Sequence, residues 1–251
     1  MESEVEILKR EVISKIMLIL FTYKDGKMGE KPLGPIAITK LIYPNNVLFA
    51  GSIIGKINEL EKLGIVLSKR EKINGKNYRI LYPNFRKFVD IFNEYYNLGL
   101  TEEEKDFLAK WFSEVDWSVL SAGVFEKMIR EKFERNIIQM VGDTIKMCLD
   151  IFSSFQANKL IKIDKSRVEK ILKNYEKMKE KLQILDKEVE FKLYVDLVRK
   201  ILNLPDGIIE KLLKLPYSSA EFEKWASMSL FQTKLFFANK ELFDKIIEQK
   251  D

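Results

Sequence analysis

The chain contains no histidine and only one cysteine, Cys148, among its 251 residues. Without histidine, neither a Ser-His-Asp triad nor a Cys-His pair can form, and zinc sites with histidine ligands are excluded. One thiol cannot close a disulfide within the chain, and there is no cysteine cluster to hold zinc or an iron–sulfur centre. Cys148 lies in the apolar segment Ile145–Leu149, so we expect a buried structural thiol rather than a nucleophile.

Long hydrophobic runs are also missing. The apolar run Ile16–Phe21 is far too short to cross a bilayer, and the first residues, MESEVEILKRE, have mixed charge and no signal-peptide pattern. We therefore expect a cytoplasmic protein with no membrane partner. The abundance of lysine, glutamate and isoleucine resembles the composition of thermophile proteins.

Positive charge is concentrated in the first third of the chain. Residues 1–90 contain 16 Lys/Arg and 10 Asp/Glu, a net charge of +6, whereas the remainder contains 27 basic and 28 acidic residues, a net charge of −1. This asymmetry favours a polyanion-binding domain joined to a neutral one. A surface of ordinary thermophile type would also carry such an excess.

Hydrophobic spacing and turn residues predict three helices in this third. The first runs from Glu2 to about Tyr23, with Arg10 and Ser14 on its solvated side. A loop of turn formers follows, and Pro35 opens a short second helix over residues 36–42. Asn46 offers an N-cap for a third helix that ends near residue 63.

The third helix has two distinct sides. An apolar side is expected from Phe49, Ile53, Ile57 and Leu60. Small residues at positions 51, 52 and 55 cost helix propensity, yet they allow another surface to come close. A DNA groove and a tightly packed neighbouring helix explain these small residues equally well.

A basic β-hairpin is predicted next. Gly64 ends the third helix, and strands over residues 65–70 and 78–82 flank Asn74-Gly75, a strong hairpin-turn signal. Five cations crowd this ribbon and are opposed only by Glu71; they are Lys69, Arg70, Lys72, Lys76 and Arg79. Charges on a hairpin often protect an exposed strand edge, but after such a helix they favour phosphate contacts.

The segment from Ile36 to Pro83 resembles the winged helix-turn-helix domain of archaeal and bacterial transcriptional regulators. The run from Leu60 to Val66 is similar to the signature that closes the recognition helix and starts the wing in the MarR, ArsR and PadR groups. The resemblance covers less than a third of the chain. It implies a fold of three helices plus a two-stranded wing, and binding of double-stranded DNA.

The resemblance also implies site residues. Base edges would be reached from the third helix by Asn46, Ser52, Lys56, Asn58 and Glu59. Phosphates or the minor groove would be contacted from the wing by Lys69, Arg70, Lys72, Lys76 and Arg79. No catalytic residue, metal site or cofactor is expected.

After residue 83 only helical patterns occur. Thr101 and Glu104 form a capping box, and further helices are predicted over about 121–134, 137–155 and 164–202, the last with a heptad-like register. The expected fold is mainly α. A winged-helix domain over residues 1–83 is followed by an all-helical domain over residues 84–251, which would serve oligomerisation, as in a homodimer, or partner binding.

These features favour a DNA-binding transcriptional regulator and not an enzyme. A protein-interaction or assembly factor, which uses the winged helix as a docking module, stays open. A replication or plasmid-maintenance protein that recognises an origin also stays open, because the sequence does not distinguish it from a regulator.

Overall fold

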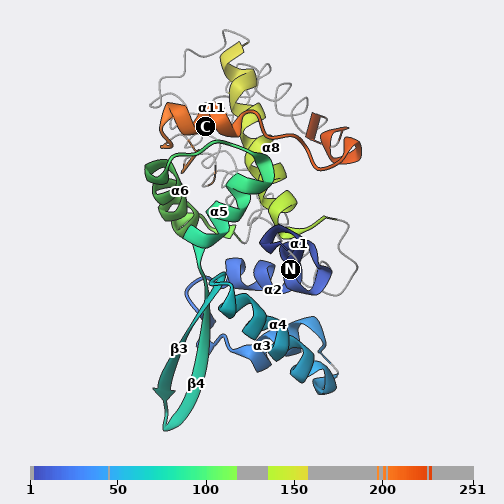
Figure 1. The fold of residues 1–251 in the computed structure, drawn as a ribbon, viewed down its shortest axis with the longest axis vertical. Helices are drawn as coiled ribbons and strands as arrows, with labels where there is room; N and C mark the ends of the chain where they lie inside the picture. Colours follow the sequence, from blue (N-terminus) through green and yellow to red (C-terminus); the bar gives the residue numbers. More distant parts are fainter. Residues whose placement is uncertain are drawn as a thin grey trace, which may run out of the picture. The chain divides into compact units, whose positions relative to one another are not determined.

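The computed structural model describes residues 3–44, 46–117, 135–157, 197, 200, 201, 203–224, 226 and 227. The chain divides into two compact units, Met1–Val141 and Gly142–Asp251. The described part is mainly helical, and its longest sheet has two antiparallel strands (Figure 1). None of the helices that the described residues form is long and apolar enough to span a membrane.

The first unit begins with two helices where the sequence predicts one. α1 (Glu4–Lys9) and α2 (Glu11–Thr22) are separated at Arg10, whose backbone is extended. The prediction of one continuous helix was therefore wrong, and so was the solvated side assigned to Ser14. Ser14 is buried, donates its hydroxyl to the Leu8 carbonyl at 2.8 Å and accepts from the Ile137 backbone N–H at 3.3 Å.

The next elements are short and lead into the helix pair. β1 (Lys27–Met28) and β2 (Lys31–Pro32) form a small antiparallel hairpin where only a loop was expected. α3 (Pro35–Ile42) begins at proline, as predicted. The third helix begins later than expected: a 3-10 turn, η1 (Val47–Phe49), precedes α4 (Ala50–Lys62), and Asn46 caps that turn by accepting from the Leu48 backbone N–H at 3.1 Å.

The long hairpin has the predicted turn and longer strands. β3 (Val66–Ile73) pairs with β4 (Lys76–Pro83) in a register that sets Ile73 opposite Lys76. Asn74 and Gly75 both have positive φ, at 49° and 78°, as a two-residue type I′ turn requires. The hairpin projects away from the helices of the first unit (Figure 1).

The base of this hairpin is attached to the segment before α3. The Leu81 backbone N–H donates to the Leu33 carbonyl at 3.0 Å. A Cβ atom on Gly34 would lie 2.8 Å from the Arg79 carbonyl oxygen, so only glycine allows this close approach. At the same end of the hairpin, the side-chain amide of Asn84, after β4, donates to the carbonyl of Gly64, before β3, at 2.8 Å.

Aromatic side chains form much of the core of the first unit. The Phe21 ring of α2 lies 4.8 Å from the Phe88 ring of α5 (Phe85–Tyr96) and 5.7 Å from the Trp117 ring. α6 (Glu102–Glu114) adds Phe112, and its N-terminus has the predicted capping box of Thr101 and Glu104. α5 and α6 thus lie in the same compact unit as the hairpin, and a functional boundary at residue 83 stays a prediction.

α8 (Ile137–Ala157) begins in the first unit and continues into the second, and it confirms the helix predicted over about 137–155. α11 (Asp206–Leu212) lies in the second unit. Buried Asp143 accepts from the Ser218 backbone N–H at 2.7 Å and from its hydroxyl. The Cys148 thiol is buried, as predicted, and burial raises its pKa to about 12. The helices predicted over 121–134 and 164–202 fall mostly outside the described residues.

Candidate nucleic-acid interface

α4 buries one side and presents a smooth opposite side. Ile53, Ile57 and Leu60 are fully buried, as expected, whereas Phe49 at its start is 45% exposed. Helical spacing puts Gly51, Gly55, Asn58 and Lys62 on the side away from the core, and all four are exposed. A Cβ atom at either glycine would meet no other described atom within 4 Å. Packing against a neighbouring helix of the described part therefore does not explain these glycines.

The hairpin also has two chemically different faces. The register and the alternation of side chains divide its residues. One face carries Val66, Ser68, Arg70, Lys72, Asn77, Arg79, Leu81 and Pro83. The other face carries Leu67, Lys69, Glu71, Ile73, Lys76, Tyr78, Ile80 and Tyr82. Arg79 contacts α4, so the more cationic face is the one on the side of α4.

Arg79 fixes the hairpin to α4. Its Nη2 donates to Asn58 Oδ1 at 2.8 Å and to Glu61, with which it forms an ion pair. The Arg79 and Glu61 side chains are only 28% and 23% exposed. The second Glu61 oxygen is buried and has no hydrogen-bond partner in the described part. Two residues expected to bind DNA, Asn58 and Arg79, are thus hydrogen-bonded to each other.

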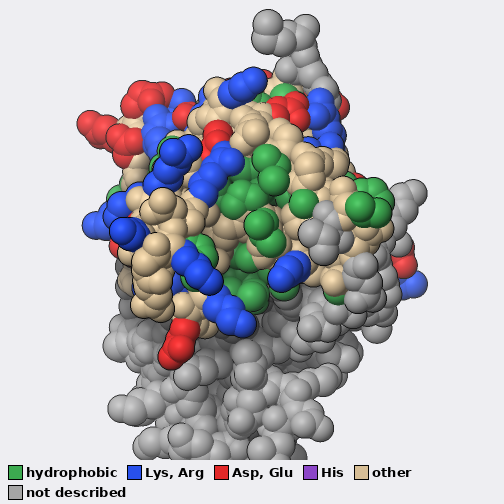
Figure 2. All heavy atoms as spheres, turned by 90° about the horizontal axis from the view of Figure 1, so that it is seen from below, with side chains coloured by type: hydrophobic (Ala, Val, Ile, Leu, Met, Phe, Trp, Pro, Cys, Tyr) green, Lys and Arg blue, Asp and Glu red, His purple; other side chains and the backbone are tan. Residues whose placement is uncertain are grey.

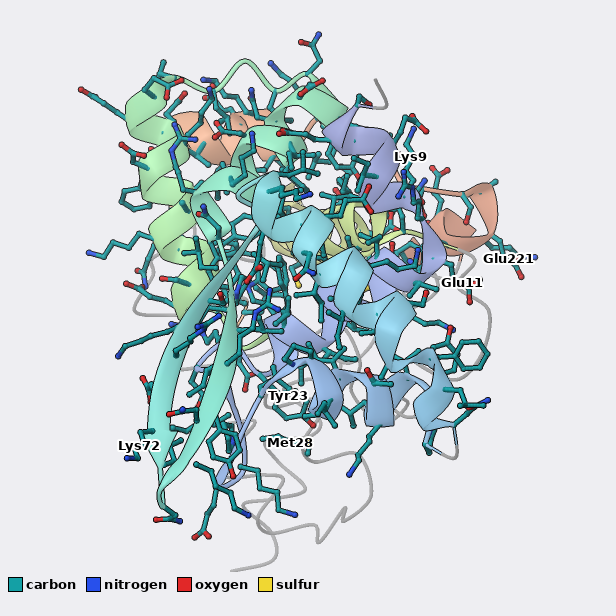
Figure 3. All side chains as sticks on the ribbon, turned by 60° about the horizontal axis from the view of Figure 1, so that its bottom comes forward. Lys9, Glu11, Tyr23, Met28, Lys72 and Glu221 are labelled. Carbon is teal, nitrogen blue, oxygen red and sulfur yellow. The ribbon has the colours of Figure 1, made fainter. Side chains whose placement is uncertain are left out.

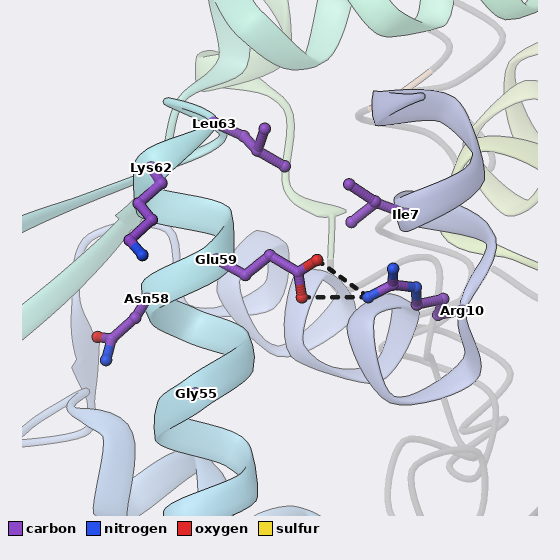
Figure 4. A pocket seen from close by; sticks show the side chains of 7 residues that line it. All are labelled: Ile7, Arg10, Gly55, Asn58, Glu59, Lys62 and Leu63. Carbon is purple, nitrogen blue, oxygen red and sulfur yellow. Dashed lines mark hydrogen bonds and ion pairs between the residues drawn. The ribbon is translucent and has the colours of Figure 1, made fainter. Parts of the chain in front are cut away.

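Glu59 is directed toward Arg10 rather than outward. Arg10 Nη1 donates to both Glu59 carboxylate oxygens, at 3.0 and 3.1 Å (Figure 4). The pair lies in a pocket of about 520 Å³ between the α1–α2 junction and α4, which Ile7 and Lys62 also line. Glu59 therefore holds the first helices to α4, and its predicted contact with a base edge would require breaking this pair.

Five other cations in this region remain without carboxylate partners. In the part of the chain that the structure describes, no ion pair involves Lys56, Lys62, Arg70, Lys72 or Lys76. Lys56 is half-buried and the others are exposed, with Lys72 far out along the hairpin (Figure 3). Lys62 is absent from the expected site, although its spacing from Gly55 and Asn58 places it on the same side of α4.

Lys69 differs from these five because it pairs with Glu71. The two charges are 2.9 Å apart, and the hydrogen bond to Glu71 raises the pKa of the Lys69 ammonium. The Lys69 side chain is 68% exposed, so the pair is of the weak, solvent-screened kind. Ser52 is exposed on α4 and Asn46 lies at the turn before it, with its amide oxygen already engaged.

No protein-family model, curated protein or solved structure matches this chain. The site must therefore be interpreted from its own geometry. Among the described residues, no group of three Cys, Asp or Glu side chains is arranged to hold a metal ion.

The lower surface of the first unit combines cations with apolar groups. Figure 2 shows a hollow of hydrophobic side chains with Lys and Arg side chains gathered around it. Tyr23 and Met28 lie between the hairpin and α3 on this side (Figure 3), and Ile36 at the start of α3 is 60% exposed. Leu48, in the turn before α4, is 92% exposed.

Proposed function

We propose that this chain binds double-stranded DNA through a winged helix and acts as a transcriptional regulator. α4 enters the major groove and the β3–β4 hairpin lies along the phosphate backbone. The observation that carries the proposal is a set of five cations on these two elements that form no ion pair with any described residue, namely Lys56, Lys62, Arg70, Lys72 and Lys76. Lys and Arg side chains without protein carboxylates are available to neutralise phosphates and to release condensed counterions.

Two further features support this arrangement. The ion pair between Arg79 and Glu61 holds the hairpin beside α4, so both elements can meet one duplex without first being ordered. The glycines at 51 and 55 leave the outer side of α4 smooth, which lets the helix backbone approach base edges closely.

The order of elements supports the winged-helix assignment. A helix, α2, is followed by a short extended segment, then α3, α4 and the β3–β4 hairpin. The hydrogen bond from Leu81 to Leu33 joins the hairpin to that extended segment. The role as a regulator rests on the resemblance over Leu60–Val66. The helical remainder would form a homodimer or bind a partner. If it forms a homodimer, the DNA target is a palindrome whose half-sites lie about one helical turn apart.

A salt series tests the proposal. Binding of a labelled random-sequence duplex is measured by fluorescence anisotropy between about 50 and 200 mM salt. Five phosphate contacts give a slope of log K against log[salt] of about −4.5. Lys72→Ala reduces that slope by about 0.9, whereas Lys110→Ala, an exposed lysine on α6, leaves it unchanged. Absence of binding at low salt, or a slope near zero, contradicts the proposal.

A protein-docking module is the second candidate, and the apolar hollow in Figure 2 favours it. A hollow with a cationic rim suits an acidic partner with apolar side chains. Ile36→Ser discriminates between the two functions, because Ile36 is exposed on α3 and lies outside the cationic set. Under the DNA proposal this substitution leaves duplex affinity unchanged.

A further inference from the structure

The turn that leads into α4 exposes an aliphatic side chain to an unusual degree. Leu48 is 92% exposed, and its backbone N–H donates to the side-chain amide oxygen of Asn46, two residues earlier, which fixes the turn. The Phe49 ring next to it lies 4.7 Å from the Tyr43 ring and is 45% exposed. The Phe49 ring therefore packs partly against Tyr43, the residue that follows α3, whereas the Leu48 side chain extends into solvent.

The same end of α4 lacks the side chains that read guanine. Lys56 is the first charged residue of α4, and the residues before it are apolar, glycine or Ser52. Guanine is typically read by two donors from Arg or Lys, whereas an apolar side chain contacts the C5 methyl group of thymine. The N-terminal residues of a recognition helix are those that reach the base edges.

We propose that Leu48 packs against thymine methyl groups in the major groove, so that this end of α4 selects A·T pairs. The inference rests on the proposed DNA binding and adds the base that is read. Insertion of the helix removes the exposed Leu48 side chain from water, and the methyl group supplies an apolar surface that cytosine lacks. Gly51 lets the first turn come close enough, since its outer side is open.

The test replaces thymidine with deoxyuridine, which lacks only the C5 methyl. The best-binding duplex is first selected from a random pool and is then synthesised in both forms. Loss of one buried methyl contact weakens binding about fourfold. The unmodified protein should therefore bind the deoxyuridine duplex about fourfold more weakly for each methyl contacted.

Leu48→Ala is the decisive variant. It should bind the two duplexes with equal affinity, because the group that contacts the methyl has been removed. Folding should be unaffected, since the side chain is almost fully exposed; an unchanged Tm verifies this. Lys76→Ala is the control, and it should weaken both duplexes alike while it keeps the fourfold difference.

Each other outcome has a definite meaning. Equal binding of both duplexes by the unmodified protein overturns the inference and leaves DNA binding intact. A fourfold difference that persists in Leu48→Ala assigns the methyl contact to another residue and also overturns it. Failure to bind any duplex at low salt overturns the proposed function itself, and this inference with it.

Discussion

Two arginines on the two strands of the β3–β4 hairpin have different roles. Arg79 and Arg70 lie directly opposite each other in the register and on the same face. Arg79 is held by Glu61 and Asn58, whereas Arg70 is exposed and, within the described residues, has no carboxylate partner. The number of cations in a sequence therefore overestimates the number available to a ligand, because nearby carboxylates such as Glu61 and Glu71 engage some of them.

The largest effect is expected when the three hairpin cations that form no ion pair with a described residue are removed together. Arg70→Ala, Lys72→Ala and Lys76→Ala combined should weaken duplex binding about 500-fold at about 0.1 M salt, because each lost phosphate contact costs roughly 0.9 log units there. Stability in urea should change little, since these side chains are exposed and form no ion pair with a described residue. A combined variant that binds DNA normally would show that the hairpin does not contact the backbone.

Arg79→Ala should instead lower stability strongly and change duplex binding less than the combined variant does. It removes the partner of Glu61, whose second oxygen is already buried without a hydrogen bond. A partly buried carboxylate left unpaired costs about 2 kcal/mol of unfolding free energy. Urea denaturation measures this loss, and Arg70→Ala is the matched control on the same face. Equal stability of the two variants would remove the distinction between the two arginines.

Gly55→Ala should change stability and DNA affinity in opposite directions. Alanine in place of glycine within a helix stabilises it by about 1 kcal/mol, and the added methyl meets no described atom. The same methyl would hold the helix away from a base edge, so DNA affinity should fall as the urea midpoint rises. Gly64→Ala is the control, because its φ of 70° disfavours alanine and stability should fall. Unchanged affinity in Gly55→Ala would mean that α4 does not approach DNA at this point.

Local signals in the sequence predicted the elements that local interactions determine. The Asn74-Gly75 turn, the Thr101–Glu104 capping box and the buried side of α4 each depend on residues a few positions apart. The helical spacing that placed Gly55 outward would also have identified Lys62. Such features need no knowledge of tertiary contacts.

The predictions that failed or changed depend on distant partners. Glu59 and Arg10 are 49 residues apart, and Glu61 and Arg79 are 18 apart, so nothing in either local pattern indicates that they meet. Ser14 is buried, and its hydroxyl accepts a hydrogen bond from the backbone N–H of Ile137, 123 residues away. The break at Arg10 carries no proline or glycine, so the sequence shows no signal for it.

The smallest expected effect is a gain in binding. Glu71→Gln removes the carboxylate that Lys69 binds at 2.9 Å and adds a sixth cation to the set of five on α4 and the hairpin. The pair is exposed and weak, so affinity for duplex DNA should rise only about two- to threefold, with a slightly steeper salt dependence. The same anisotropy titration measures it, and Glu114→Gln on α6 should have no effect because it lies outside the hairpin and α4. If releasing Lys69 leaves both affinity and salt slope unchanged, then an unpaired cation on this hairpin is not sufficient for DNA contact, and position along the strand decides instead.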